Sequence, residues 1–280
     1  MFERFDRSWR LAKASAAVLR QDKELVLFPL ISLGALVLVL LCFAAPVIGL
    51  GVLDGLHGGR ISALHYAIAF LFYFCQYFVI FFFNAALVGA AMVRLEGGTP
   101  TLAGGLHIAA SKAGAIAGYA LIAATVGMVL RAIQERVGFI GRIIVGLLGM
   151  GWTIATYLVV PVLVDRDVGP VEAVKESALL LKETWGENVI GQVGLGAVFG
   201  LVFIAVALCG AALTFGAFMT HSVALVVAAL ALTVLAIGVC ALVQSALAGI
   251  YSAALYRYAS TGEGTQGFDA ATLKLAFAPK

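Results

Sequence analysis

Six long runs of apolar residues divide this chain, and the charged residues lie in the connections and tails between them. Each run is about as long as, or longer than, the roughly 20 residues that an α-helix needs to cross the hydrocarbon core of a bilayer. The runs do not alternate apolar with polar residues, as the strands of a membrane barrel do. The pattern therefore predicts six membrane-spanning helices, at residues 25–53, 64–93, 113–130, 143–164, 189–218 and 223–256.

A shorter segment with the periodicity of an amphipathic helix precedes the first, third and fifth runs. In the first of these segments, the basic residues lie mostly off the apolar stripe. The second is rich in glycine, and we expect Thr99 to cap it and Pro100 to occupy its first turn. The third begins at Pro170. Its predicted apolar stripe consists of Val171, Val174, Ala178, Leu181 and Trp185.

These features predict an all-α fold, a polytopic membrane helix bundle in which six transmembrane helices form three hairpins. Each hairpin is expected to follow a cytoplasmic amphipathic helix, and the three units run in the same sense. We expect a single integral membrane domain over residues 1–280. Within it, the amphipathic N-terminal helix covers 1–24, the six transmembrane helices with their loops cover 25–257, and a cytoplasmic tail covers 258–280.

The composition excludes most soluble classes of protein. Hydrophobic residues make up 62% of the chain and charged residues 12%, whereas about 25% of the residues in a soluble domain are charged. The mean hydropathy is +1.06, and a single soluble core could not bury so much apolar surface. Basic clusters and long polar tracts are missing, so we expect no nucleic-acid partner. The four cysteines lie inside apolar runs without metal-ligand spacing, and we expect neither a metal nor a cofactor.

Lysine and arginine residues are distributed unevenly between the two sides of the predicted bundle. Most of them lie in the N-terminal tail, the second and fourth connections and the C-terminal tail. The other side holds only Arg60, Arg131, Arg136 and Arg142. Because cytoplasmic loops are enriched in basic residues, we expect both termini in the cytoplasm. The residues of the N-terminal segment that we expect to contact anionic lipid are Arg4, Arg7, Arg10 and Lys13.

A few polar residues lie inside the predicted spans. Asn84 follows three phenylalanines, so its amide has to find a partner within the bundle rather than in lipid. Gln76 lies two turns earlier on roughly the same face of the helix. Two interpretations stay open, namely hydrogen bonds between helices and the lining of a cavity. The residues that would line such a cavity are Tyr73, Gln76, Asn84, Trp152, Tyr157 and Gln244.

Sequence motifs for catalysis are missing. The chain has no GxSxG, HExxH, Walker-type or GxGxxG sequence. Acids on the expected cytoplasmic side, such as Asp165 and Glu176, interleave with Arg166 and Lys175, which is typical of a solvated, charge-balanced helix. No hydrophilic stretch is long enough for a soluble catalytic domain. We therefore expect that the protein is not an enzyme.

Several short motifs carry a resemblance to a known family. They are FERFDRSWRLAKAS, FFFNAALVGAA, RLEGGTPT, VPVLV, ETWGEN and the terminal FDAATLKLAFAPK. With these motifs, the chain resembles a bacterial domain-of-unknown-function family of polytopic membrane proteins over nearly its full length. More distantly, it resembles the membrane domain attached to some glycerophosphodiester phosphodiesterases, but it lacks their catalytic domain, so no active-site residue carries over. The resemblance implies a location in the bacterial plasma membrane and a membrane fold, and it implies no activity.

Two functional interpretations follow from these observations. The absence of buried charge, the amphipathic segments and the basic tail favour a non-catalytic membrane component that organises lipid or a partner protein. Its expected partners are the lipid bilayer, anionic lipid at the cytoplasmic face and a membrane protein. The alternative is a transporter or channel for an apolar or neutral solute, which Gln76, Asn84 and Gln244 would serve. An integral-membrane enzyme would instead need acids or histidines that converge at one interface.

Overall fold

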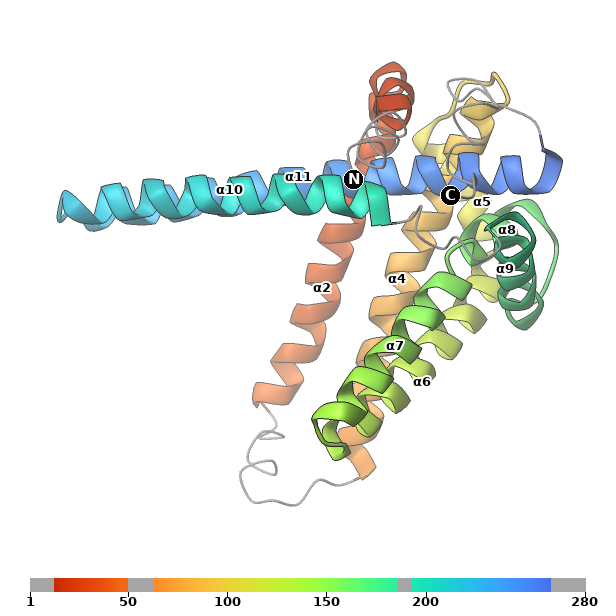
Figure 1. Cartoon of the computed structure of the whole chain (residues 1–280), viewed down its shortest axis with the longest axis horizontal. Helices are drawn as coiled ribbons and strands as arrows, with labels where there is room; N and C mark the ends of the chain where they lie inside the picture. The colour runs from red at the N-terminus through yellow and green to blue at the C-terminus, as the bar shows by residue number, and fades with distance from the viewer. Residues whose placement is uncertain (1–12, 50–62, 186–192, 263–280) are drawn as a thin grey trace.

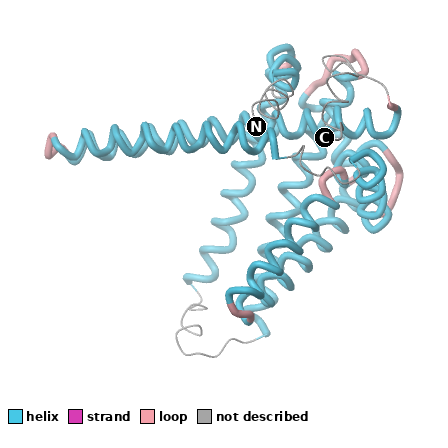
Figure 2. The backbone as a smooth tube through the Cα atoms, in the orientation of Figure 1, coloured by secondary structure: helices cyan, strands magenta, loops and turns pink. Residues whose placement is uncertain are grey.

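The computed structural model describes residues 13–49, 63–185 and 193–262, and this part of the chain is helical apart from short turns, with no strand (Figures 1 and 2). The all-α prediction is therefore confirmed for these residues. A helical segment covers residues 13–21. The elements that follow are η1 (Lys23–Val26), α2 (Leu27–Gly49), α4 (Ala63–Leu95), α5 (Leu102–Ser111), α6 (Ala113–Arg136), α7 (Phe139–Ala155), α8 (Val159–Asp165), α9 (Pro170–Trp185), α10 (Val193–Met219) and α11 (Val223–Thr261).

Within the described residues, six helical stretches are long and apolar enough to cross a membrane, as the sequence predicts. The third continues beyond the predicted end to Arg136, since Gln, Glu and Arg prolong a helix readily. The sixth continues to Thr261 and ends where Gly262 adopts a left-handed conformation with φ 72°. Parts of the first and fifth predicted runs, at 50–53 and 189–192, lie outside the described residues.

The long helices form two groups (Figure 1). In the first group, α4 contacts α2 on one side and α6 on another, and α6 contacts α7. In the second group, α10 packs along the first part of α11, and this pair extends away from the first group in a crosswise direction. The second part of α11 crosses α4 and joins the two groups.

The buried core lies where the two groups meet. It is built from the last turns of α4, the first turns of α6, the short helices α5 and α8, one face of α9, and the second part of α11. Tyr256 and Leu255 of α11 and Leu163 of α8 are among its fully buried side chains. We call this region the charged end, defined by the end of α4 at Leu95 together with α5, α8, α9 and residues 246–261 of α11.

The fourth apolar run, predicted as one span over 143–164, is divided in the structure. α7 ends at Ala155, a turn covers the next residues, and α8 begins at Val159. Pro161 lies in the first turn of α8, where a missing backbone N–H is tolerated. A continuous helix would clash with its ring and lose a hydrogen bond, so the break falls one turn before the proline. The predicted span is thus present, within the stretch Phe139–Asp165, as two helices joined by a turn rather than as one helix.

The start of α5 also differs from the prediction. Thr101, rather than Thr99, caps the helix in an extended conformation, and its hydroxyl accepts a hydrogen bond of 3.0 Å from the backbone N–H of Gly104. Pro100 consequently precedes the helix instead of occupying its first turn. The sequence TPT offers two threonines as caps, and apolar periodicity does not separate them.

The third short helix, α9, begins at Pro170 as predicted, and the predicted apolar stripe matches its buried face in part, since Leu181 is buried and Val174 packs against the core. Ala173, Ser177 and Leu181 are the buried residues of α9, whereas Val171 is 49% exposed. Small side chains let α9 approach its neighbours closely. The contacts with neighbouring helices, and not the size of the side chains, therefore decide which face of α9 is buried. The side chain of Trp185 lies outside the described part of the chain.

Candidate functional site

A single buried serine holds the two halves of the divided fourth span together. The hydroxyl of Ser177 in α9 donates a hydrogen bond to the carbonyl of Ala155 at 2.7 Å. The same oxygen accepts a hydrogen bond from the backbone N–H of Leu158 at 3.0 Å. Both backbone groups would otherwise lie unpaired in a buried region, which is costly. Ser177 therefore replaces the helical hydrogen bonds that the break removes, and it fixes α9 against the break.

Other polar groups of the turn at the break form hydrogen bonds within the same segment of the chain. The hydroxyl of Thr156 donates to the carbonyl of Trp152 at 2.8 Å. The backbone N–H of Tyr157 donates to Ile154 at 3.1 Å, and that of Val159 donates to Thr156 at 3.2 Å. The break is thus a defined turn whose polar groups have partners, which is the form in which irregular backbone persists at membrane depth.

Tyrosine side chains surround the break. Tyr119 of α6 is buried, interacts with Thr156, and packs on Phe81 of α4 with ring centroids 4.4 Å apart. Tyr157 packs against the buried core. Tyr251 of α11 is also buried, and its hydroxyl has no hydrogen-bond partner among the described residues. The break is therefore enclosed by protein, and the hydroxyl of Tyr251 is a buried polar group in the same core.

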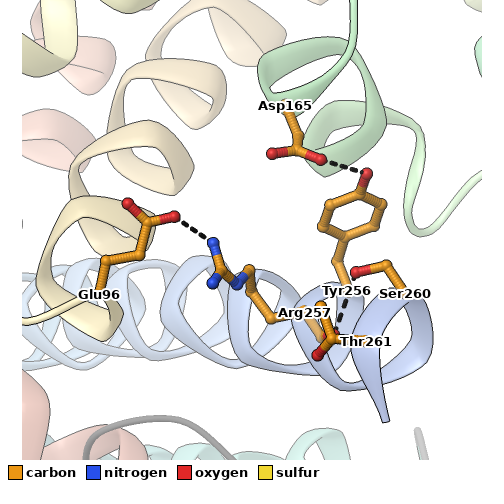
Figure 3. Close-up of polar contacts among 6 residues, drawn as sticks. All are labelled: Glu96, Asp165, Tyr256, Arg257, Ser260 and Thr261. Atoms are coloured by element: carbon orange, nitrogen blue, oxygen red, sulfur yellow. Dashed lines mark hydrogen bonds and ion pairs between the residues drawn. The ribbon is translucent and has the colours of Figure 1, made fainter. Parts of the chain in front are cut away.

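At the C-terminal end of α8, a charged network joins α8, α9 and α11. The hydroxyl of Tyr256 donates to the carboxylate of Asp165 at 2.7 Å (Figure 3). It also accepts a hydrogen bond from Nε of Arg166 at 3.2 Å, and Arg166 forms an ion pair with Glu176. The hydrogen bond that Arg166 donates to Tyr256, together with the nearby carboxylates, raises the pKa of Arg166 above its usual value. The end of the fourth span is thus tied to α9 and to α11.

Further ion pairs connect the remaining elements of the charged end. Arg257 of α11 pairs with Glu96 just after α4 (Figure 3). Nε of Arg94 lies 2.7 Å from Asp22, in the segment that precedes the first span. Nζ of Lys112 lies 3.3 Å from Asp167, which joins the start of α6 to the α8–α9 connection. The sequence placed these acids and bases on solvated surfaces, and it did not indicate that they pair across the chain.

The six residues proposed to line a cavity are all half-buried. Tyr157 lies in the turn of the break, Trp152 lies one turn earlier in α7, and Oδ1 of Asn84 lies near the backbone of Gly249 in α11. Tyr73 is engaged elsewhere, because its hydroxyl accepts a hydrogen bond of 2.6 Å from Arg131. Gln76 and Gln244 complete the set. That these residues line a common cavity stays a prediction.

The other predicted site lies mostly outside the described residues. Of the four basic residues expected to contact anionic lipid, Arg4, Arg7 and Arg10 fall in the part that the structure does not describe, and Lys13 is exposed. In the described ranges, no group of three His, Cys, Asp or Glu side chains could hold a metal ion.

The break and most of the charged network fall within a recognised sequence family. Residues 63–268 match the family described as "Family of unknown function (DUF6159)". No curated protein matches the chain.

Proposed function

Because this chain belongs to the DUF6159 family, whose function is unknown, we propose its role from its own geometry. The protein is a non-catalytic, multi-pass component of the bacterial plasma membrane that organises lipid or a partner protein beside the α10–α11 pair. In this proposal the six spans form three hairpins, each following a short amphipathic helix, and the charged end faces the cytoplasm. The distant likeness to the membrane domain of glycerophosphodiester phosphodiesterases extends, in this proposal, to the membrane fold alone.

One observation carries this proposal. The α10 helix and the first part of α11 pack on each other, and the rest of the described chain leaves their outer faces uncovered. Leu208 of α10, for example, is 66% exposed. Helix pairs of this kind need lipid or another membrane protein on their apolar faces. A pair that extends away from its own bundle presents that surface to a neighbour.

Position-specific photo-crosslinking in native membranes tests the proposal. A photoreactive amino acid replaces Leu208 on the α10–α11 pair or, as the matched control, the exposed Leu148 on α7. We expect one defined adduct, either a protein of a single mass or a lipid of a single class, from position 208 and a mixture of bulk lipid from position 148. The same mixture of bulk lipid at both positions would contradict the proposal.

A second candidate function, transport of an apolar or neutral solute, is favoured by the divided fourth span. Transporter sites commonly form at discontinuous helices near the middle of the membrane, and the unpaired hydroxyl of Tyr251 lies in the same core. If this function holds, a cysteine at Thr156 reacts with a small water-soluble thiol reagent. The matched control is a cysteine at Ala120, which is also buried. If the cysteines at both positions failed to react with the reagent to the same extent, a water-filled pathway at the break would be excluded.

A further inference from the structure

The helix α9 has an inner face that the bundle covers completely. Ala173, Ser177 and Leu181 follow one another at four-residue steps and are buried. They face α6, α7, α8 and α11, all of which contact α9. Pro170 at the start of α9 also lies close to Gly118 of α6. This face is therefore fully used within the chain.

The opposite face of α9 is exposed and carries two kinds of side chain. Val171 is 49% exposed and Leu179 is 56% exposed. Lys175 and Lys182 are exposed as well. These four residues are spaced by three or four positions, so they share one side of the helix. We call this side, made of Val171, Lys175, Leu179 and Lys182, the outer face of α9.

The charge of the outer face is positive. Among the described residues, neither lysine forms an ion pair. Glu172 is the exposed acid beside the face, and Glu176 is neutralised by its ion pair with Arg166. The outer face itself thus carries two ammonium groups and no carboxylate, which attracts anions, and of the acids beside it the side chain of Glu183 lies outside the described residues.

The position of α9 places this face at the edge of the membrane. Ser177 binds the backbone of Ala155 and Leu158, which belong to a membrane-spanning stretch. Glu176 pairs with Arg166, just beyond the polar end of that stretch. A helix fixed at this level lies between hydrocarbon and water. There, exposed Val and Leu side chains enter the acyl region while lysines extend to the headgroups.

We propose that the outer face of α9 is a binding surface for anionic phospholipid headgroups. The aliphatic side chains insert beside the acyl chains, and the two lysines hold the phosphates. This inference deepens the lipid part of the proposed function and rests on the chain lying in a membrane. It does not depend on the α10–α11 pair. The lipid surface on α9 can therefore be disproved while the crosslinking result at Leu208 stands, and the crosslinking can fail while the lipid surface stands.

The test measures lipid enrichment around the full-length protein. The protein is reconstituted in nanodiscs of phosphatidylcholine with a minor fraction of phosphatidylglycerol of the same acyl chains, and the lipids that remain bound are quantified by native mass spectrometry. We expect the wild-type protein to be enriched in phosphatidylglycerol. This enrichment should fall about fivefold in each single variant, Lys175→Gln or Lys182→Gln, and further in the double variant that combines them. The double variant Lys175→Arg with Lys182→Arg keeps the charge and should keep the enrichment.

A matched variant separates this surface from general attraction of charge. Arg136→Gln with Arg142→Gln removes two exposed positive charges from the end of α6 and from the start of α7. We expect this variant to retain the enrichment. An equal loss in both double variants would overturn the proposal, because the effect would then follow net charge alone. Soluble glycerophosphoglycerol is added as a competitor. If it displaced the bound phosphatidylglycerol as effectively as the lipid itself does, the proposal would be overturned too, because the surface would then bind a soluble phosphate compound rather than a membrane lipid.

A second measurement reports on the aliphatic side chains. An environment-sensitive fluorophore is attached to a cysteine at Leu179 in a variant without the four native cysteines. We expect its emission to shift to the blue in bilayers, and more strongly with phosphatidylglycerol than without it. The control label at Gln134, an exposed position at the end of α6, should not respond to phosphatidylglycerol. A label at Leu179 that emits as it does in water would overturn the proposal.

Discussion

Two hydroxyl groups, those of Ser177 and Tyr256, join helices that are separated along the chain. Ser177 binds backbone atoms of the fourth span from α9. Tyr256 binds the carboxylate of Asp165, 91 positions away in sequence. Each hydroxyl both donates and accepts, so each satisfies two groups at once. The stability of the charged end is therefore sensitive to the loss of a single oxygen atom at either place.

We expect the replacement Ser177→Ala to lower the stability of the protein by about 2 kcal/mol, because the carbonyl of Ala155 and the N–H of Leu158 lose their partner in a buried region. Thermal unfolding in detergent, followed by intrinsic tryptophan fluorescence, measures this change. Ser111→Ala is the matched control, since Ser111 is exposed and binds only a carbonyl of its own helix. A melting temperature equal to that of the control would contradict the role of Ser177.

The replacement Tyr256→Phe keeps the buried ring and removes only the hydroxyl. We expect a loss of about 1 kcal/mol, because a hydrogen bond to a partly solvated carboxylate contributes modestly. The same unfolding assay measures it, and Tyr66→Phe on the exposed surface of α4 serves as the control. The role assigned to Tyr256 would be wrong if the two variants unfolded at the same temperature.

At the scale of elements, α5 packs on α4 with unusually small separation. A Cβ atom on Gly105 would lie 2.5 Å from Cζ of Phe28 and 2.7 Å from the backbone carbonyl oxygen of Ala86. On the facing helix, a Cβ on Gly89 would lie 2.8 Å from a methyl group of Ile108. Small residues at such contacts allow helix backbones to approach in a membrane. The position of α5 thus depends on glycine at these two sites.

We predict that Gly105→Ala destabilises the protein by about 1–3 kcal/mol, because the new methyl group meets a backbone oxygen that cannot rotate away. Gly114→Ala in α6 is the matched control, since nothing lies within 4 Å of its Cβ position. Alanine favours a helix by about 1 kcal/mol over glycine, so the control should be neutral or more stable. Chemical unfolding of both variants compares them, and equal stability would show that α5 lies farther from α4.

The sequence predicts the long helices well because length and apolar content decide where a span lies. The bounds of α4 agree with the prediction to within two residues, whereas α6 continues to Arg136 because polar helix-forming residues prolong it. The same reasoning misses the division of the fourth span. Pro161 signals a disturbance there, but the hydrogen bonds that stabilise it come from Ser177, which belongs to another element. Periodicity within one segment contains no information about such a partner.

The candidate site was predictable only in part, for a related reason. Tyr157, selected as a polar-aromatic residue inside a span, lies in the turn of the break and Trp152 lies in α7 just before it, whereas their place in a cavity stays a prediction. The ion pair between Arg257 and Glu96 was not anticipated, because its members are 161 positions apart. By contrast, the pair Arg131–Glu135 follows from helical spacing and is present at 3.1 Å. Local spacing is readable in a sequence, whereas contacts between distant segments depend on the fold.

Across the whole molecule, tight packing is concentrated at the charged end. Away from it, the long helices expose leucine, valine and phenylalanine side chains along α2, α7, α10 and the first part of α11. A water-soluble protein rarely exposes apolar surface of this extent. Surrounding lipid has to cover these faces, so the membrane is part of what stabilises the arrangement.

This arrangement leads to a prediction of orientation. Because cytoplasmic segments are enriched in Lys and Arg, the charged end should face the cytoplasm and the connection between α6 and α7 should face the outside. In a variant without native cysteines, single cysteines are introduced at Asp167 or Gln134, both of which are exposed. We expect a membrane-impermeant maleimide to label Gln134→Cys in intact cells and Asp167→Cys only after permeabilisation. Labelling of both after denaturation controls for expression, and the reverse order of labelling would place the charged end outside the cell.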